Sequence, residues 1–402
     1  MRWPRRLWCR MFQKSMRLLL PLLPYRNPQI LHHIQDIHQV KKNHPLIVTG
    51  SHTVQSEGMQ ELIQQYESVS IFDGVKANPT TDQIGQAYQM YQQEHCDHII
   101  GFGGGSSLDC AKAVAAQIAR PQKTIAQMAG VLKVRKKTPL LILIPTTAGT
   151  GSETTLAAVV TDSQTHHKYA INDFVLIPDV AILDPVLTLS LPPHLTASTG
   201  MDALTHAMEA YMGRSMTKQT RQEALTAIRL IYENILVAYR DGTNRRARKN
   251  MLQASYLAGD AFSKSYVGYV HAIAHSLGGQ YNLPHGQTNA TLLPIVLQAY
   301  GHTIDKKLHD IATEIGLADA SMPDEKAAQK MIESIRQLDQ AMDIPLTIPQ
   351  IQKQDIPQMA RYADQEANPL YPVPVLWDQN ELEQIYEQAM DKKRNLDTIK
   401  EE

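Results

Sequence analysis

Five side chains in the second half of the chain have the types and the spacing of a metal-binding site. Asp202 and His206 stand four positions apart in an apolar segment. Further along, His271 and His275 repeat that spacing, and His285 follows in a Pro-His-Gly turn. Residues four apart on a helix share one face, so each pair can direct both side chains toward one point. Either pair alone would most simply be a packing or surface pair, but the five together indicate a site for a divalent cation.

The ligand types restrict which cation such a site would hold. One carboxylate and three imidazoles, without sulfur, suit Fe(II) and Zn(II) first, with Mn(II), Co(II) or Ni(II) also possible. The chain has three cysteines, and none lies beside the cluster, so a thiolate-ligated zinc site is not expected. The ligand types alone leave the identity of the metal open.

A glycine-rich loop in the first half has the composition of a phosphate-binding site. Gly103, Gly104, Gly105 and Ser106 follow a β-rich apolar run and open a helical pattern. Glycines let a ligand approach the backbone, and Ser106 could cap the helix, whose free N–H groups would face an anion. The spacing departs from G-x-G-x-x-G, so this is not the ordinary Rossmann fingerprint. A purely structural turn is the alternative.

A second loop, from Pro145 to Glu153, also follows an apolar run. Its threonine hydroxyls and glycines suit the ribose and phosphate oxygens of a nucleotide, although threonines that cap a helix entry would look the same. Ligands of open α/β sheets bind at the carboxyl ends of the strands. Because the two loops both follow predicted strands, they support each other, and we expect a dinucleotide to bind there.

The elements that must position these residues fall into two kinds. The first half alternates β-rich runs with helical patterns, which predicts a parallel sheet covered by helices. Expected strands are 46–48, 69–72, 98–102, 140–144 and 180–183, and expected helices are 55–66, 82–95 and 107–119.

After Pro192 and Pro193 strand-like runs nearly vanish and long amphipathic patterns take over. We therefore predict an α/β dinucleotide-binding domain at 17–192 and an all-α metal-binding and catalytic domain at 193–402. Helices in the second domain are expected at 196–212, 217–239, 246–264, 268–280, 291–300, 305–315 and 324–341, followed by a loop-rich stretch at 344–372 and a last helix at 379–391.

Composition excludes several classes of protein. The 402 residues carry a net charge of −1, which gives no electrostatic case for binding nucleic acid. Three cysteines cannot form a disulfide framework and match a reducing compartment, so we expect a cytoplasmic protein. No apolar run is long enough to cross a bilayer. Residues 1–26 contain seven basic residues and no acid, and lack the features of a signal peptide. We expect either a native start at Met11 or Met16 or a poorly ordered basic arm, with a transit peptide as the alternative.

These motifs, taken in order, resemble the iron-containing (group III) alcohol dehydrogenases. The resemblance rests on the stretch from Gly103 to Lys112, the Thr146–Glu153 loop, the Asp202–His206 motif and the His271–His285 element. It extends from about residue 45 to residue 391. The family has the dehydroquinate-synthase-like fold, an α/β nucleotide-binding domain followed by a helical metal-binding domain, and its members are expected to be dimers.

The resemblance also implies roles for individual residues. It assigns Asp202, His206, His271 and His285 as the metal ligands, with iron as the expected cation, and places His275 near the nicotinamide as a catalytic group rather than a ligand. Near the cofactor it places the glycine-rich loop, Gly103 to Ser106, together with Asn78, Thr146, Thr147, Thr155 and Lys168.

One departure from the family bears on the choice of cofactor. NAD-preferring members usually place an Asp after the first strand, where it accepts hydrogen bonds from the adenosine ribose. Here the sequence is Val48-Thr49-Gly50-Ser51. Without that carboxylate nothing repels a 2′-phosphate, and Gly50 and Ser51 could donate N–H and O–H to it. We therefore expect NADP(H) to be favoured over NAD(H).

The predicted function is that of a metal-dependent, NAD(P)(H)-linked alcohol dehydrogenase or aldehyde reductase. Hydride would pass between C4 of the nicotinamide and a metal-bound small alcohol or aldehyde, while His275 shuttles the proton. One alternative is a dehydroquinate-synthase-like lyase with NAD and zinc, which would need a basic pocket that the segments around the metal motifs lack. A glycerol-type dehydrogenase of the same fold and a non-catalytic assembly subunit are the remaining alternatives.

Overall fold

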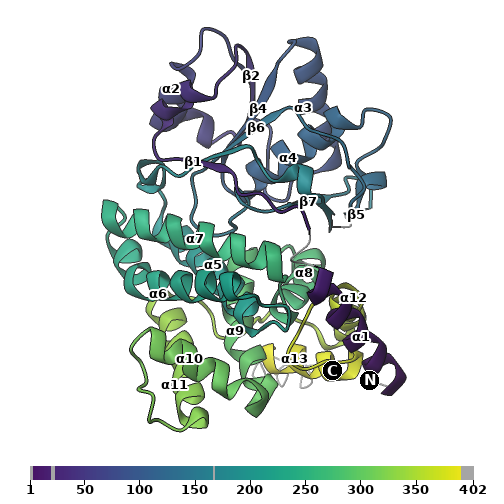
Figure 1. The fold of residues 1–402 in the computed structure, drawn as a ribbon, viewed down its shortest axis with the longest axis vertical. Coiled ribbons are helices and arrows are strands. Elements are labelled where there is room, and N and C mark those ends of the chain that lie inside the picture. The colour runs from purple at the N-terminus through teal and green to yellow at the C-terminus, as the bar shows by residue number, and fades with distance from the viewer. Residues whose placement is uncertain (1–2, 20–22, 166–167, 391–402) are drawn as a thin grey trace, which may run out of the picture. The chain divides into compact units, whose positions relative to one another are not determined.

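The computed structural model describes residues 3–19, 23–165 and 168–390 (Figure 1). The chain forms two compact units. The first, called here the α/β unit, consists of Pro24–Leu191 and Gly242–Ser263. The second, called the helical unit, consists of the described parts of Met1–Leu23, Pro192–Asp241 and Lys264–Glu402.

The α/β unit is built on a parallel sheet with strand order β1-β9-β6-β4-β2-β3. The strands are β1 (Gln29–Leu31), β2 (Pro45–Val48), β3 (Ser70–Phe72), β4 (His98–Gly103), β6 (Leu140–Pro145) and β9 (Val180–Ile182). Each pairs with its neighbours in parallel. The predicted parallel sheet is therefore present, with β1 as an additional edge strand that was not predicted, because only one of its three residues is buried and it forms no apolar run.

Alternating strand residues enter two separate cores, as the period of two in a β-strand requires. Leu141 and Leu143 pack in one apolar cluster, and Ile142 and Ile144 pack in the other. Both faces of the sheet are thus buried, which explains why these strands read as continuous apolar runs. The helices that follow the strands are α2 (Glu57–Ile63), α3 (Thr81–Gln93) and α4 (Gly105–Ala119).

A small second sheet belongs to the same unit and was not predicted. It contains β5 (Gly130–Val131), β7 (Ala157–Thr161) and β8 (Lys168–Asn172) in the order β5-β8-β7. Its strands are short: β5 has two exposed residues, and β7 and β8 are only partly buried, in contrast to the fully buried β4.

The helical unit contains long helices with buried apolar faces. They are α5 (Pro193–Met212), α6 (Lys218–Arg240), α8 (Tyr269–Tyr281), α9 (His285–Tyr300), α10 (Asp305–Glu314), α11 (Asp324–Ala341), α12 (Ile356–Ala367) and α13 (Gln379–Ala389). Helix α12 lies in the stretch predicted to be loop-rich. Its Pro357 stands in the first turn, where proline is compatible with a helix, so that prediction was wrong for 356–367.

The units differ from the predicted domain ranges in two segments. Helix α7 (Arg245–Ser265) belongs to the α/β unit as far as Ser263. A Cβ on its Gly259 would lie 2.9 Å from the Cα of Gly151, so the helix packs directly against the Pro145–Glu153 loop. The second segment is α1 (Trp3–Leu19), which joins the helical unit.

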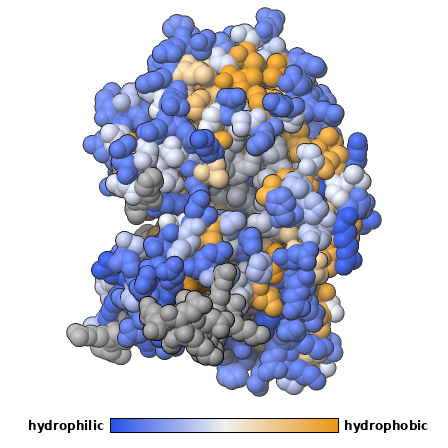
Figure 2. Space-filling model, turned by 180° about the vertical axis from the view of Figure 1, so that it is seen from behind, coloured by the Kyte–Doolittle hydropathy of each residue, from blue (hydrophilic) through white to orange (hydrophobic). Residues whose placement is uncertain are grey.

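Helix α1 overturns the expectation of a poorly ordered basic arm. Cys9 is fully buried and Gln13 is nearly so. The Gln13 amide donates to the carbonyl oxygen of Tyr371 at 2.7 Å, which fixes this helix on the helical unit. Within the described residues, none of the helices has the length and apolarity needed to span a bilayer. Most of the face drawn in Figure 2 is hydrophilic, with patches of hydrophobic residues among the polar ones.

Candidate metal centre and nucleotide loops

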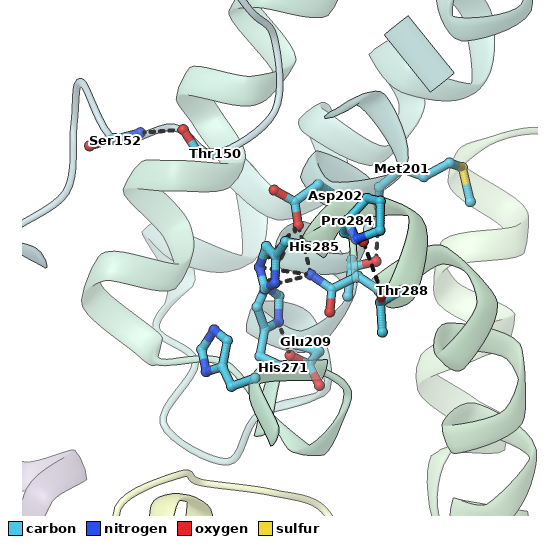
Figure 3. Close-up of polar contacts among 12 residues, drawn as sticks. Thr150, Ser152, Met201, Asp202, Glu209, His271, Pro284, His285 and Thr288 are labelled. Atoms are coloured by element: carbon cyan, nitrogen blue, oxygen red, sulfur yellow. Dashed lines mark hydrogen bonds and ion pairs between the residues drawn. The ribbon is translucent and has the colours of Figure 1, made fainter. Parts of the chain in front are cut away.

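Asp202, His271 and His285 bring three potential metal-ligand atoms together within 4.8 Å of one another. The carboxylate oxygen Oδ1 of Asp202 lies 3.9 Å from His271 Nε2 and 3.7 Å from His285 Nε2. Figure 3 shows the three side chains pointing toward one another from three different helices, α5, α8 and α9. Residues far apart in the sequence thus converge on one point, as their types and spacing predicted.

The position of His285 depends on a close approach between two helices. His285 does not lie in the predicted turn: it is the first residue of α9, which has Pro284 as its N-cap. A Cβ on the next residue, Gly286, would lie 2.3 Å from the carbonyl oxygen of Ser198 in α5. Glycine is therefore required there, because any side chain would push the start of α9 away from the helix that carries Asp202.

Asn289, which the sequence analysis missed, touches all three candidate ligands. Its Nδ2 lies 2.7 Å from Asp202 Oδ1, 3.3 Å from His271 Nε2 and 3.1 Å from His285 Nε2. The residue is fully buried. Three acceptor atoms that converge on one amide present the electron pairs that a cation needs, so the residues fit a divalent metal. Asn289 could have been found in the sequence from its position four residues after His285, which places both residues on one face of a helix.

Glu209 is a second residue that the sequence analysis missed. Its Oε2 accepts a hydrogen bond from His271 Nδ1 at 2.6 Å. The backbone N–H groups of Gly268 and Val270 hold the same carboxylate at 2.8 and 2.7 Å. Burial alone would lower the pKa of His271, but the hydrogen bond to Glu209 and the charges of Glu209 and Asp202 raise it. The bond at Nδ1 leaves His271 Nε2 directed at the cluster, which is the arrangement of a metal-ligating histidine.

The other two histidines of the motifs lie beside the cluster. His206 is buried, and its ring stacks on that of His271 with 4.4 Å between the ring centroids. His275 stacks on His285 at 5.1 Å. His275 Nδ1 bonds to Glu366 Oε1 at 2.7 Å, and the hydroxyl of Tyr371 donates to that same oxygen, also at 2.7 Å. The close group of three contains neither histidine.

The glycine-rich loop joins β4 to α4, as predicted, but its cap differs. The N-cap is Gly104, which has no side chain, and the helix begins at Gly105. Ser106 was expected to be the cap, and this was wrong: its hydroxyl instead accepts from the backbone N–H of Asn78 at 3.3 Å. Gly103 has a φ of 143°, in a region that side chains rarely adopt.

The two loops predicted to hold the nucleotide lie next to each other in the α/β unit. The Thr146 N–H donates to the carbonyl oxygen of Gly103 at 2.9 Å, and a Cβ on Gly104 would lie 3.4 Å from a methyl group of Thr147. The carboxyl ends of β4 and β6 are paired at this point. The backbone of both loops is thus brought to one edge of the sheet, where ligands of this fold class bind.

The remaining predicted cofactor residues fall into three places. Asn78 joins the glycine-rich loop through Ser106, and its Oδ1 accepts from Lys168 Nζ at 2.9 Å. Thr155 is buried, and its hydroxyl accepts from Lys112 Nζ at 2.9 Å. Gly50 and Ser51 follow the end of β2, and Ser51 is exposed.

Comparison with known proteins agrees with this geometry. Residues 25–185 match the family model described as iron-containing alcohol dehydrogenase, and residues 196–390 match the C-terminal model of the Fe-containing alcohol dehydrogenase family. The chain belongs to the iron-containing alcohol dehydrogenase family. The resemblance and the enzyme class predicted from the sequence are thereby confirmed.

Individual members of the iron-containing alcohol dehydrogenase family are similar over most of their length. The 1,3-propanediol dehydrogenase of Citrobacter freundii is 38% identical over 323 residues, which cover 80% of this chain and 83% of that protein. The NADPH-dependent butanol dehydrogenase of Clostridium saccharobutylicum is 34% identical over 78% of this chain and 82% of its own. A crystal structure of 1,3-propanediol oxidoreductase superposes with a TM-score of 0.86 at 34% identity, over 91% of this chain and 99% of that one. The predicted dehydroquinate-synthase-like fold class is therefore also confirmed.

Proposed function

We propose that this iron-type dehydrogenase interconverts a small alcohol and its aldehyde or ketone with NAD(P)+ and NAD(P)H. In the oxidative direction the alcohol carbon loses a hydride to C4 of the nicotinamide and the hydroxyl loses a proton, which gives the carbonyl compound, NAD(P)H and H+. The observation that carries the proposal is the convergence of Asp202, His271 and His285 in a chain of this family.

The metal would be held by Asp202, His271 and His285, with His206 as the fourth ligand. The close group of three supports the first assignments. His206 is assigned because its ring is buried against His271. One carboxylate and three imidazoles suit Fe(II), with Zn(II) or another divalent cation as the alternative. When bound, such a cation supplies Lewis acidity toward an alcohol or carbonyl oxygen.

His275 is the candidate for moving the proton. It lies beside the cluster without belonging to it, and its side chain is 26% exposed. Because Glu366 engages Nδ1, the Nε2 atom of His275 is directed away from that carboxylate. An imidazole nitrogen can both accept and donate a proton, so His275 can take the alcohol proton or return it.

The nucleotide would bind at the two adjacent loops of the α/β unit. We assign to it Gly103, Gly104, Gly105 and Ser106 and the hydroxyls of Thr146 and Thr147, with Asn78, Thr155 and Lys168 nearby. Gly50 and Ser51 replace the acid that would repel a 2′-phosphate, which favours NADP(H). The ratio of kcat/KM for NADPH to that for NADH measures this preference. A clear preference for NADH would remove the role given to Gly50 and Ser51.

A homodimer and a cytoplasmic location complete the proposal. The dimer is the expectation for the family, and light scattering from the purified protein tests it. The cytoplasm is proposed because all three cysteines are free thiols, as expected in a reducing compartment.

The proposed activity is tested with protein purified without oxygen. Metal content is measured first, and oxidation of NADPH and NADH is then followed with a panel of short aldehydes, with and without a chelator. We expect aldehyde-dependent oxidation that the chelator abolishes and added Fe(II) restores. Metal-loaded protein that oxidises neither cofactor with any aldehyde of the panel would contradict the proposal.

A further inference from the structure

Side chains of helix α1 form hydrogen bonds with the backbone of the segment that follows α12. The guanidinium of Arg10 donates to the carbonyl oxygens of Val373 and Pro374, both at 2.7 Å. The Gln13 amide donates to the carbonyl oxygen of Tyr371 at the same distance. Residues 368–378 contain neither helix nor strand, so their carbonyl groups are not bonded in a regular ladder. Three of them are bonded by side chains of α1, whose sequence lies far from them in the chain.

Helix α1 also forms an ion pair with α12 itself. Arg5 pairs with Asp364 at 2.9 Å, and Asp364 is almost buried. The contacts of α1 therefore lie on both sides of Glu366, two residues before it on the helix and five to eight residues after it in the loop. The backbone N–H of Arg214 adds one bond, to the carbonyl oxygen of Pro372 at 2.7 Å. Glu366 is thus carried by a segment that α1 holds at these points, while the hydroxyl of Tyr269 in α8 bonds to Asn368 and Trp377 at its two ends.

A chain of hydrogen bonds leads from this segment to the proposed proton carrier. The hydroxyl of Tyr371 donates to Glu366 Oε1 at 2.7 Å, and the same oxygen bonds to His275 Nδ1 at 2.7 Å. Tyr371 is itself the residue whose carbonyl oxygen Gln13 holds. A shift of the loop would move the tyrosine, then the carboxylate, and then the ring of His275.

We propose that α1 is a positioning element of the active site, which fixes the ring of His275 through Tyr371 and Glu366. This inference rests on the proposed function, in which His275 carries the proton. Glu366 and Tyr371 are positioning residues: they orient the imidazole and keep Nε2 free. Small displacements of a proton-transferring group lower turnover strongly, so contacts on the outer surface of the unit can set kcat.

The test uses the full chain with Arg10→Ala and Gln13→Ala combined, which removes all three bonds to the loop. We expect unchanged metal content, a kcat lowered about tenfold, and a KM for the nicotinamide cofactor within about twofold of the unmodified enzyme. Hydrogen exchange at residues 366–376 should become faster. Arg6→Ala is the matched control, because Arg6 pairs only with Glu381 among the described residues, on the exposed start of α13. Both kcat and exchange should stay unchanged in this control.

A coupling experiment separates positioning from general stability. Tyr371→Phe removes the hydroxyl that links the loop to Glu366, and should lower kcat by a similar factor. When Arg10→Ala and Gln13→Ala are added to Tyr371→Phe, kcat should fall by less than about a further twofold. The reason is that the α1 substitutions and Tyr371→Phe interrupt the same connection to Glu366. Arg10→Lys, which keeps a donor, should recover part of the loss even if the double variant folds poorly.

Three results would overturn the inference: unchanged kcat in the Arg10 and Gln13 variants, full additivity with Tyr371→Phe, or loss of the metal. Inactivity of the unmodified, metal-loaded enzyme would instead reject the proposed function. Faster exchange at 366–376 would still report the contact between α1 and the loop in that case.

Discussion

Helix α8 carries two histidine–carboxylate pairs one turn apart, and their surroundings differ. His271 Nδ1 bonds to Glu209 at 2.6 Å, and His275 Nδ1 bonds to Glu366 at 2.7 Å. The first pair is almost completely buried, whereas the side chains of the second are 26% and 33% exposed. Glu209 is held by two backbone N–H groups, and Glu366 by the hydroxyl of one side chain.

The contrast shows how one sequence spacing can supply two kinds of histidine. In both pairs the carboxylate orients the ring by bonding to Nδ1. Backbone anchoring and burial make the His271 pair rigid, which suits a ligand that must hold a cation in place. Partial exposure gives the His275 pair access to water, which suits a group that must exchange protons. Substitutions in the two pairs should separate a loss of metal from a loss of proton transfer.

The largest effect is expected from His271→Ala. This change removes one of the three convergent ligand atoms and leaves Glu209 buried beside the space of the lost ring. We expect the purified protein to lose its metal and its dehydrogenase activity to fall to background. Elemental analysis and NAD(P)H oxidation measure both quantities. Full metal occupancy in the variant would show that His271 is not a ligand.

His275→Ala should have a smaller and different effect. The metal content is expected to stay unchanged, because His275 lies outside the close group of candidate ligands. The value of kcat should fall about 100-fold, the scale of a lost general acid–base group. If the variant instead loses its metal, the two histidines of α8 have been assigned the wrong way round.

Next in size is Glu209→Gln. The amide would place an N–H group toward a backbone donor or toward His271 Nδ1, so one hydrogen bond is lost and the ring is held less firmly. We expect metal affinity to fall about 10- to 100-fold, as measured by competition with a chelator. Glu366→Gln is the matched control, and its metal affinity should stay at the level of the unmodified protein.

The parts of this site that the sequence predicted are those encoded by spacing within one helix. Asp202 and His271 could be found because chemically active residue types recur at helical intervals. The main strands could be found because residues such as Leu141 to Ile144 form apolar runs that are buried on both faces. Each of these features is local, so a window of a few residues contains it.

The supporting residues could not be predicted, because their role depends on contacts between distant segments. Glu366 lies 91 positions from His275, and nothing around it in the sequence marks it. Glu209 reads locally as one more acid on an amphipathic helix, yet it is buried. The docking of α1 was missed for the same reason, since its basic residues have no acidic partners nearby in the sequence.

Another acid, Asp339 in α11, is fully buried but lacks the hydrogen bonds that Glu209 and Glu366 receive. Among the described residues, neither of its side-chain oxygens has a hydrogen-bond partner. Burial raises the pKa of Asp339 from its ordinary 3.8 to about 8. The folded protein therefore keeps a proton that the unfolded chain releases, so this group favours folding at low pH and stability is lost as the pH rises toward 8.

Asp339→Asn should remove that dependence on pH. We expect the free energy of unfolding to rise over that of the unmodified protein, and to rise more at pH 8.5 than at pH 5. The difference should be roughly 4 kcal/mol, at about 1.4 kcal/mol for each pH unit between pH 5 and the folded pKa of about 8, and urea denaturation at the two pH values measures it. The matched control is Asp364→Asn, because Asp364 is also nearly buried but accepts from Arg5 and Asn368. Removing its charge should destabilise the protein at both pH values, since it weakens the hydrogen bonds that Asp364 accepts from Arg5 and Asn368. If both substitutions change the free energy of unfolding equally, hydrogen-bond donors do not determine how these two acids influence stability.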